Sequence, residues 1–276
     1  MVSIETAALA LTGAYGFLVL GLVLFQRRLQ YLPDRRHTPI ARAGLAGGEE
    51  LRLETADGES LVAWHFPPQR DKPTILYFHG AAGALAKRVP RLRLFVESGF
   101  GVLAVSYRGY SGSTGRPSEG GLLQDAECAY RAARARYGVD QLVIVGASLG
   151  TSVAVALASR HEAAALVLLA PFLSAMDVAA RRFPFAPVKW LMRDRFRADL
   201  AIARVRTPVL MIHGERDPII PIRSGRRLFE LANAPKVFLS VPGGGHLVLA
   251  ASGVFAEMRD WIDGVLAEKG LAAEDE

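Results

Sequence analysis

The sequence predicts an α/β fold in which a mainly parallel β-sheet is covered by helices on both faces. Short apolar runs alternate with helical stretches along most of the 276 residues, and this alternation is typical of parallel sheets. With 51% hydrophobic residues, the chain is long enough to bury a substantial core in one large domain. The runs interpreted as parallel strands comprise residues 74–79, 101–107, 142–146, 165–169, 208–213 and 237–241.

Residues 6–25 contain no charged side chain and predict a membrane anchor over residues 1–26. At about 1.5 Å per residue, a helix of this length spans the roughly 30 Å hydrocarbon core of a bilayer. A cleaved signal peptide is the alternative, but residues 1–5 carry no Lys or Arg and residues 25–28 offer no small-residue cleavage site. The sequence therefore favours a retained anchor and a single-pass membrane protein.

Basic residues after the anchor predict its orientation. Positively charged residues that flank a span tend to stay in the cytoplasm. The single cysteine, Cys128, agrees with a reducing compartment. We therefore expect the domain to face the cytoplasm. The flanking basic residues are Arg27, Arg28, Arg35 and Arg36.

Residues 27–50 follow the anchor and predict a juxtamembrane arm. They contain Pro33, Pro39 and three glycines and lack a sustained helical or strand period. The catalytic domain is expected over residues 51–268. The last residues, 269–276, end in Glu-Asp-Glu and predict a frayed acidic tail.

The domain is expected to begin with a hairpin. Two runs typical of strands, residues 51–55 and 61–66, flank the pair Asp57-Gly58. Asp-Gly between two such runs is a strong turn signal, so the hairpin opens the sheet.

Ser148 is the candidate nucleophile. It lies in a Gly-x-Ser-x-Gly pentapeptide, between Gly146 and Gly150, directly after the apolar run at 142–145. This pattern is typical of a sharp strand-to-helix turn, because glycines two residues either side let strand and helix pass closely. The helix expected over residues 151–160 points its positive end at the serine and favours oxyanion charge there.

Two downstream residues complete a candidate catalytic triad. Asp217 lies just beyond the strand at 208–213, and His246 lies on a glycine-rich loop after the run at 237–241. The order nucleophile, acid, histidine, each past a strand end, is that of α/β-hydrolases. Asp177 is a rival position for the acid; we prefer Asp217, because it lies close beyond its strand and is followed by a turn-fixing proline.

At these residues the chain resembles the α/β-hydrolase superfamily, and it is closest to the small membrane-anchored abhydrolase-domain branch. The resemblance covers roughly residues 50–268 and implies an eight-stranded, mainly parallel sheet. Residues 79–83, His-Gly-Ala-Ala-Gly, look like the oxyanion loop of the superfamily, so the backbone amides of Ala81 and Leu149 are the implied oxyanion donors. Residues 106–115 resemble the Asp-Tyr-Arg-Gly-Tyr-Gly-x-Ser-x-Gly segment of that branch.

Two residues depart from the pattern of that branch. Ala81 stands where relatives often have Asn, and Ser106 stands where they have Asp. Since the oxyanion donor is a backbone amide, alanine need not abolish it.

Residues 172–206 interrupt the strand-helix alternation and are interpreted as a cap insertion. Residues 181–197 interleave aromatic and basic side chains. One interpretation is a short amphipathic helix that packs its aromatics on the domain. The other is an interfacial element that touches lipid headgroups and guides acyl chains to Ser148.

The composition indicates which kinds of partner the protein can bind. The formal net charge of +6 is consistent with an anionic membrane surface. Binding of nucleic acid is not expected, since no recognisable module is present. The six histidines show no zinc-site spacing, and the expected reaction needs no metal or organic cofactor.

The predicted function is two-step acyl transfer by a membrane-anchored serine hydrolase. Ser148 attacks a carbonyl, His246 takes its proton and later protonates the leaving group, and Asp217 orients the imidazole. The expected substrates are carboxylic esters or thioesters with acyl or lipid-like character. A serine peptidase of the same fold and a non-catalytic membrane-tethered scaffold are the alternatives.

Overall fold

The computed structural model describes residues 3–70 and 72–274. Its centre is an eight-stranded sheet in the order β10-β9-β8-β7-β4-β6-β3-β2. All neighbouring strands are parallel except where β3 pairs with β2 and β6, so the predicted α/β fold with a mainly parallel sheet is confirmed. The strands are β2 (Glu49–Glu54), β3 (Ser60–Phe66), β4 (Thr74–Phe78), β6 (Gly101–Val105), β7 (Leu142–Ala147), β8 (Ala165–Leu169), β9 (Val209–Gly214) and β10 (Lys236–Val241).

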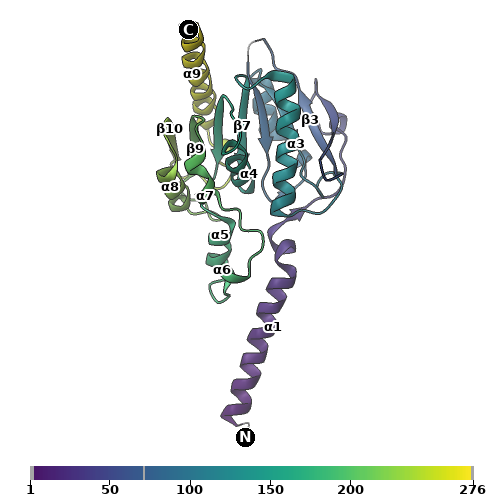
Figure 1. Cartoon of the computed structure of the whole chain (residues 1–276), viewed down its shortest axis with the longest axis vertical. Helices are drawn as coiled ribbons and strands as arrows, with labels where there is room; N and C mark the ends of the chain where they lie inside the picture. Colours follow the sequence, from purple (N-terminus) through teal and green to yellow (C-terminus); the bar gives the residue numbers. More distant parts are fainter. Residues whose placement is uncertain (1–2, 71, 275–276) are drawn as a thin grey trace.

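Helices cover both faces of this sheet. Along β4, Leu76 and Phe78 pack on one face and Ile75 and Tyr77 on the other, as strand alternation requires. The first face is covered by α3 (Glu119–Tyr137), α4 (Leu149–Ala158) and α8 (Ile222–Leu231), and the second by α2 (Val89–Glu97) and α9 (Val254–Glu274). Figure 1 shows α3 lying across the near face of the sheet.

The insertion at 172–206 folds into short helices rather than one long one. They are α5 (Ala175–Arg182), α6 (Val188–Leu191), α7 (Ala198–Ala201) and a 3-10 turn at Ile202–Arg204. In Figure 1, α5 and α6 lie at the end of the domain from which helix α1 (Ile4–Gln30) projects, whereas α9 projects from the opposite end. By length and composition, α1 can cross a membrane, alone among the helices in the described residues.

Three boundaries differ from those expected. Helix α1 continues past residue 26 to Gln30, because side chains of its last turn bind the insertion. The arm contains a 3-10 turn, Ile40–Arg42, and strand β1 (Leu32–Pro33), which pairs with β5 (Ala82–Gly83). The expected tail is helical as far as Glu274, since α9 continues through it.

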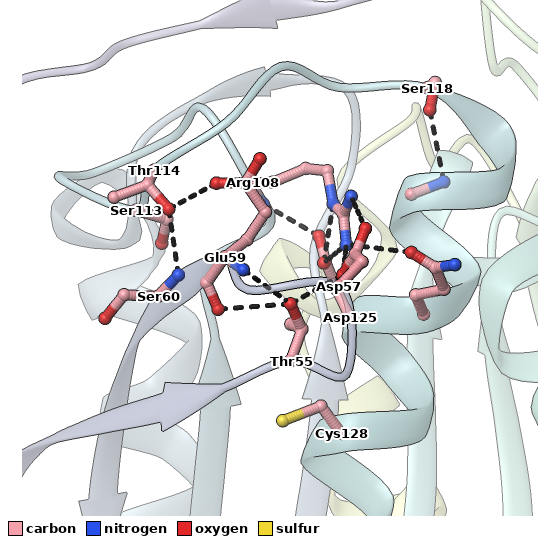
Figure 2. Close-up of polar contacts among 12 residues, drawn as sticks. Thr55, Asp57, Glu59, Ser60, Arg108, Ser113, Thr114, Ser118, Asp125 and Cys128 are labelled. Atoms are coloured by element: carbon pink, nitrogen blue, oxygen red, sulfur yellow. Dashed lines mark hydrogen bonds and ion pairs between the residues drawn. The ribbon is translucent and has the colours of Figure 1, made fainter.

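Arg108 connects the segment at 106–115 to α3 and to the β2–β3 turn by hydrogen bonds (Figure 2). Its guanidinium donates to Asp125 of α3 at 2.8 Å and to Asp57 of the β2–β3 turn at 2.7 Å and 3.1 Å. Burial raises the pKa of Asp125 to about 6 against the opposing pull of Arg108, whereas hydrogen bonds from Arg108 lower the pKa of Asp57 to about 2. The turn Asp57-Gly58 therefore serves both as the predicted hairpin turn and as an anchor for this segment.

Candidate active site

Ser148 occupies a strained turn between β7 and α4. Its φ is 51° and its ψ is −120°, a conformation that non-glycine residues rarely adopt and that clusters at functional sites. A Cβ at Gly150 would overlap the carbonyl oxygen of Phe78, and a Cβ at Gly146 would overlap the carbonyl oxygen of Gly150. Both glycines are therefore required for β4, β7 and α4 to approach as closely as they do.

Asp217 and His246 form a hydrogen-bonded pair at the ends of β9 and β10. The distance from His246 Nδ1 to Asp217 Oδ2 is 2.7 Å. The other carboxylate oxygen, Oδ1, accepts from the backbone amides of Ile219 at 2.8 Å and Ile220 at 2.9 Å. Burial alone would raise the pKa of Asp217, but the bonds from His246 and these amides outweigh it and hold the pKa below its usual value. The carboxylate is thus fixed in place and ionised.

His213 lies behind this pair. Its Nε2 is 2.8 Å from the carbonyl oxygen of Ile220 and 3.6 Å from Asp217 Oδ2. Burial lowers the pKa of His213, which favours the neutral ring. A neutral ring there supports the loop that carries Asp217.

Asp177 lies apart from this pair in its hydrogen bonding. Its Oδ2 accepts from the Ser174 hydroxyl at 2.8 Å, and its own amide donates to the same hydroxyl at 3.0 Å. Ser174 is the N-cap of α5, so Asp177 belongs to a helix cap. The hydrogen bonds of the described residues connect Asp217, and not Asp177, to His246.

Ala81 lies on a loop that several side chains support. The carbonyl oxygen of Ala81 accepts from the amide of Leu32 at 3.0 Å and from the Tyr110 hydroxyl at 2.8 Å. A Cβ at Gly80 would be 3.2 Å from the Ser148 Cβ, so the loop lies directly against the serine. Leu149 is the first residue of α4, and first-turn amides lack an intrahelical acceptor.

His79 supports the loop that carries Ala81 through two polar contacts. Its Nδ1 is 2.7 Å from the carbonyl oxygen of Gly80, and its Nε2 is 3.4 Å from the amide of Tyr107. Burial, with a smaller contribution from Arg88, lowers the pKa of His79 to about 3. The ring is therefore neutral at ordinary pH, and it donates through Nδ1 and accepts at Nε2. Residues 106–115, which resemble a segment of the family, thus support the loop that carries Ala81 through Tyr107 and Tyr110.

One cavity of about 570 Å³ brings the candidate residues together. Ser148, Leu149, Ala81 and His246 all line it, and its volume is in the range of small-molecule sites. Within the described residues, no hydrogen bond joins Ser148 to His246, as is common in ligand-free hydrolases. Shared lining of one cavity is the relation that the structure gives between Ser148 and His246.

The cavity is apolar, and its charged lining is basic. Aliphatic and aromatic side chains make up most of the wall, many of them from α1 and from the cap insertion, and no carboxylate of the described residues lines it. This lining favours an apolar ligand and disfavours a cationic one. The arginines at the wall are Arg88, Arg91 and Arg182.

Sequence reasoning missed the contribution of α1 to this cavity. Val19, Leu22, Val23 and Gln26 line it together with the cap. The helix is apolar on all sides over residues 6–25, so no periodicity marked one face as different. Only Gln26, a polar residue next to the apolar run, offered a signal.

The chain is similar in sequence to proteins of bacteria and plants over most of its length. A family model described as the alpha/beta hydrolase fold matches residues 73–201. The Mycobacterium tuberculosis protein Rv2307c is 37% identical over 247 residues, which cover 87% of this chain and 88% of that protein. The alpha/beta hydrolase domain-containing protein WAV2 of Arabidopsis thaliana is 31% identical over 87% of this chain and 88% of its own length.

The fold is also similar to that of solved structures. The esterase Pf2001 of Pyrococcus furiosus superposes with a TM-score of 0.64 at 16% identity, covering 87% of this chain and 98% of the esterase. Likeness at this identity concerns the fold alone. The sequence relatives and the strand order agree with it, and the chain belongs to the alpha/beta hydrolase superfamily.

Proposed function

We propose that this α/β hydrolase is a membrane-anchored serine hydrolase that cleaves ester or thioester bonds of acyl substrates. The observation that carries the proposal is the relation of three residues. Ser148, in its strained turn, shares one cavity with His246, whose ring is held by Asp217 at 2.7 Å.

The first step forms an acyl-enzyme. Ser148 Oγ attacks the substrate carbonyl carbon while His246 Nε2 takes the hydroxyl proton, and the carbonyl electron pair moves onto the oxygen. When the tetrahedral intermediate collapses, the bond to the leaving alcohol or thiol breaks and His246 returns the proton to it. Asp217 accepts from Nδ1 throughout, so Nε2 is free to act as the base.

The second step releases the acid. Water attacks the acyl-enzyme carbonyl, His246 takes a proton from that water, and Ser148 leaves with the proton restored to its oxygen. In both steps the negative oxygen is assigned to the amides of Ala81 and Leu149. The Ala81 amide belongs to the peptide group whose carbonyl oxygen is that of Gly80, and His79 Nδ1 holds this oxygen at 2.7 Å. A donor fixed in this way needs little reorganisation during the reaction.

The cavity lining supports an acyl substrate. Each methylene buried against such a wall favours binding by about 0.8 kcal/mol. Medium-chain or longer esters should therefore be preferred to acetyl esters. A short peptide would place its amides against apolar walls without partners, which costs free energy.

Helix α1 supports attachment to a membrane. Its apolar length fits a bilayer, and the arginines that follow it favour a cytoplasmic domain by the positive-inside tendency. We assign the domain to the cytoplasmic face on this basis.

A substrate panel tests the proposal. The full-length protein in detergent is assayed on p-nitrophenyl esters, acyl-CoAs, lysophospholipids and short peptides. We expect ester or thioester turnover that Ser148→Ala lowers at least about a thousandfold. Ser159→Ala is the matched control, because Ser159 lies at the far end of α4 and donates to the Ala156 carbonyl oxygen at 2.9 Å.

Three results would contradict the proposal. Cleavage of peptides alone would indicate a serine peptidase. No turnover on any substrate would favour a tethered scaffold. Equal loss in the Ser148 and Ser159 variants would remove the nucleophile assignment.

A further inference from the structure

Helix α1 is attached to the cap insertion by polar side chains along its length. The Tyr15 hydroxyl donates to the Phe185 carbonyl oxygen at 2.9 Å. Gln26 Oε1 accepts from the Arg193 amide at 2.8 Å. Near the same end of the helix, Gln26 Nε2 donates to the Leu191 carbonyl oxygen at 3.4 Å, and Gln30 Nε2 donates to the Asp194 carbonyl oxygen at 3.0 Å. Arg27 donates to the Asp194 carboxylate at 2.7 Å and 3.1 Å.

One face of α1 is turned toward the cavity. The half-buried residues Val19, Leu22, Val23, Gln26 and Gln30 recur at helical spacing, so they share one side of the helix. All five line the cavity that contains Ser148. The opposite side is exposed. It includes Phe17, with 79% of its surface exposed, and Leu24, with 67%.

We propose that α1 is one wall of the acyl-binding site, and that an acyl chain enters this site from the bilayer between α1 and the cap. Val19, Leu22 and Val23 then set the preferred chain length. This inference rests on the proposed function, because it needs an acyl chain bonded to Ser148. It commits to one occupant, the acyl chain of a bilayer-borne ester.

The depth of the contact between α1 and the cap supports entry from the bilayer. Arg27 is the first charge after the uncharged segment and marks the edge of the hydrocarbon. Tyr15 lies twelve residues earlier, which is about 18 Å along the helix, whereas one leaflet contributes about 15 Å of hydrocarbon. The Phe185 carbonyl that Tyr15 binds therefore lies level with the uncharged segment of α1. Tilting of the helix brings this contact nearer the membrane surface, where the exposed Arg181, Arg182 and Lys189 can extend to the headgroups.

The exposed surface of the cap tip fits that position. Trp190 is 84% exposed and Phe185 is 48% exposed, which would be unfavourable for aromatic side chains in water. The bond from Tyr15 satisfies a carbonyl that lipid could not. Of the two interpretations of the insertion, packing of all aromatics on the domain is wrong for these two residues.

The continuity of the cavity supports the acyl chain as occupant. The wall from Gln30 to Val19 extends about 17 Å along α1. It connects the reacting serine with the segment placed in the leaflet, and it is lined without carboxylates. A chain attached to the carbonyl at Ser148 can thus follow α1 without crossing water.

The test compares two alkyl fluorophosphonates that differ only in chain length. The full-length protein in lipid vesicles is labelled with ethyl and dodecyl probes, and the ratio of the two labelling rates is measured. We expect Leu22→Trp and Val19→Trp to lower the dodecyl-to-ethyl ratio at least tenfold, because the indole occupies the part of the cavity that the long chain needs. Leu24→Trp, on the lipid-facing side, should leave the ratio within twofold of wild type.

A crosslinking measurement gives a second readout. A dodecyl fluorophosphonate with a terminal diazirine is bonded to Ser148 and irradiated, and the crosslinked peptide is identified by mass spectrometry. We expect crosslinks within residues 15–30.

The outcomes separate this inference from the proposed function. Wild-type protein that reacts with neither probe contradicts the proposed function and, with it, this inference. Normal labelling of Ser148 with an unchanged ratio in Leu22→Trp and Val19→Trp contradicts the inference alone. Crosslinks confined to residues outside α1 also overturn it.

Discussion

Arg27, in the last turn of α1, forms a bidentate ion pair with Asp194 of the cap insertion, with N···O distances of 2.7 Å and 3.1 Å. The Asp194 side chain is nearly buried, whereas half of Arg27 is exposed. The pair therefore joins α1 to the cap at the point where the chain leaves the apolar segment.

Removing this pair should loosen α1 from the domain. Arg27→Met leaves the buried Asp194 carboxylate without its guanidinium, and we expect the free energy of unfolding to fall by about 1–3 kcal/mol, at the lower end because Arg27 is half exposed. Thermal unfolding of the full-length protein in detergent measures this. Arg28→Met is the matched control, since the Arg28 side chain lies over the Phe25 ring and forms no hydrogen bond or ion pair with the other described residues. An equal loss in both variants would show that the pair contributes nothing.

The acid of the triad can be identified by comparing two aspartates. Asp217→Asn removes the charge that holds His246 in the working tautomer, and we expect kcat to fall by about three to four orders of magnitude. Asp177→Asn changes only a helix cap and should leave kcat within a few-fold of wild type. Steady-state kinetics on a soluble ester compares the two, and the reverse ranking would reassign the triad.

The activity should fall at acid pH. Asp217 has a lowered pKa, so its carboxylate stays ionised down to below pH ~4 and its stabilising bond is lost only below that pH. His79, with a pKa of about 3, stays neutral over the same range. Asp125, with a pKa of about 6, is a second group that protonates as the pH falls. A histidine base must be neutral to accept a proton, so we expect kcat/KM to fall toward low pH in the wild type and also in Asp125→Asn. A profile that stays flat down to pH ~5 would contradict a histidine base.

The exposed aromatics of the cap should matter only for substrates held in a membrane. We expect Phe185→Ala combined with Trp190→Ala to lower turnover of a vesicle-borne ester at least fivefold more than turnover of a soluble ester. Leu231→Ala is a control, since Leu231 is exposed on α8, outside residues 172–206. Equal losses on both substrates would mean that the aromatics support packing and not contact with lipid.

The sequence predicted those parts of the site that depend on local structure. Ser148, Asp217 and His246 each follow a strand, and the parallel order of the strands brings their ends to one edge of the sheet. The turn at Ser148 depends on Gly146 and Gly150, so a sequence of five residues is enough to predict it. The parallel sheet followed from the alternation of apolar runs, and its eight strands were implied by the family resemblance.

The remaining parts depend on contacts between residues far apart in the chain. Arg27 binds Asp194 across 167 positions, and Tyr15 binds Phe185 across 170. The support of Ala81 by Leu32 arises because β1 pairs with β5, two strands of two residues each that carry no periodicity. A uniformly apolar α1 likewise gave no sign that one of its faces lines the cavity.

The identity of the nucleophile is tested most directly by covalent labelling. The full-length protein is treated with a fluorophosphonate, and the modified peptide is sequenced by mass spectrometry in the wild type, Ser148→Ala and Ser159→Ala. The account predicts a single adduct on Ser148 in the wild type and in Ser159→Ala, and none in Ser148→Ala at unchanged helix content. Labelling of Ser148→Ala at the wild-type rate, or an adduct on another residue of the wild type, would contradict it.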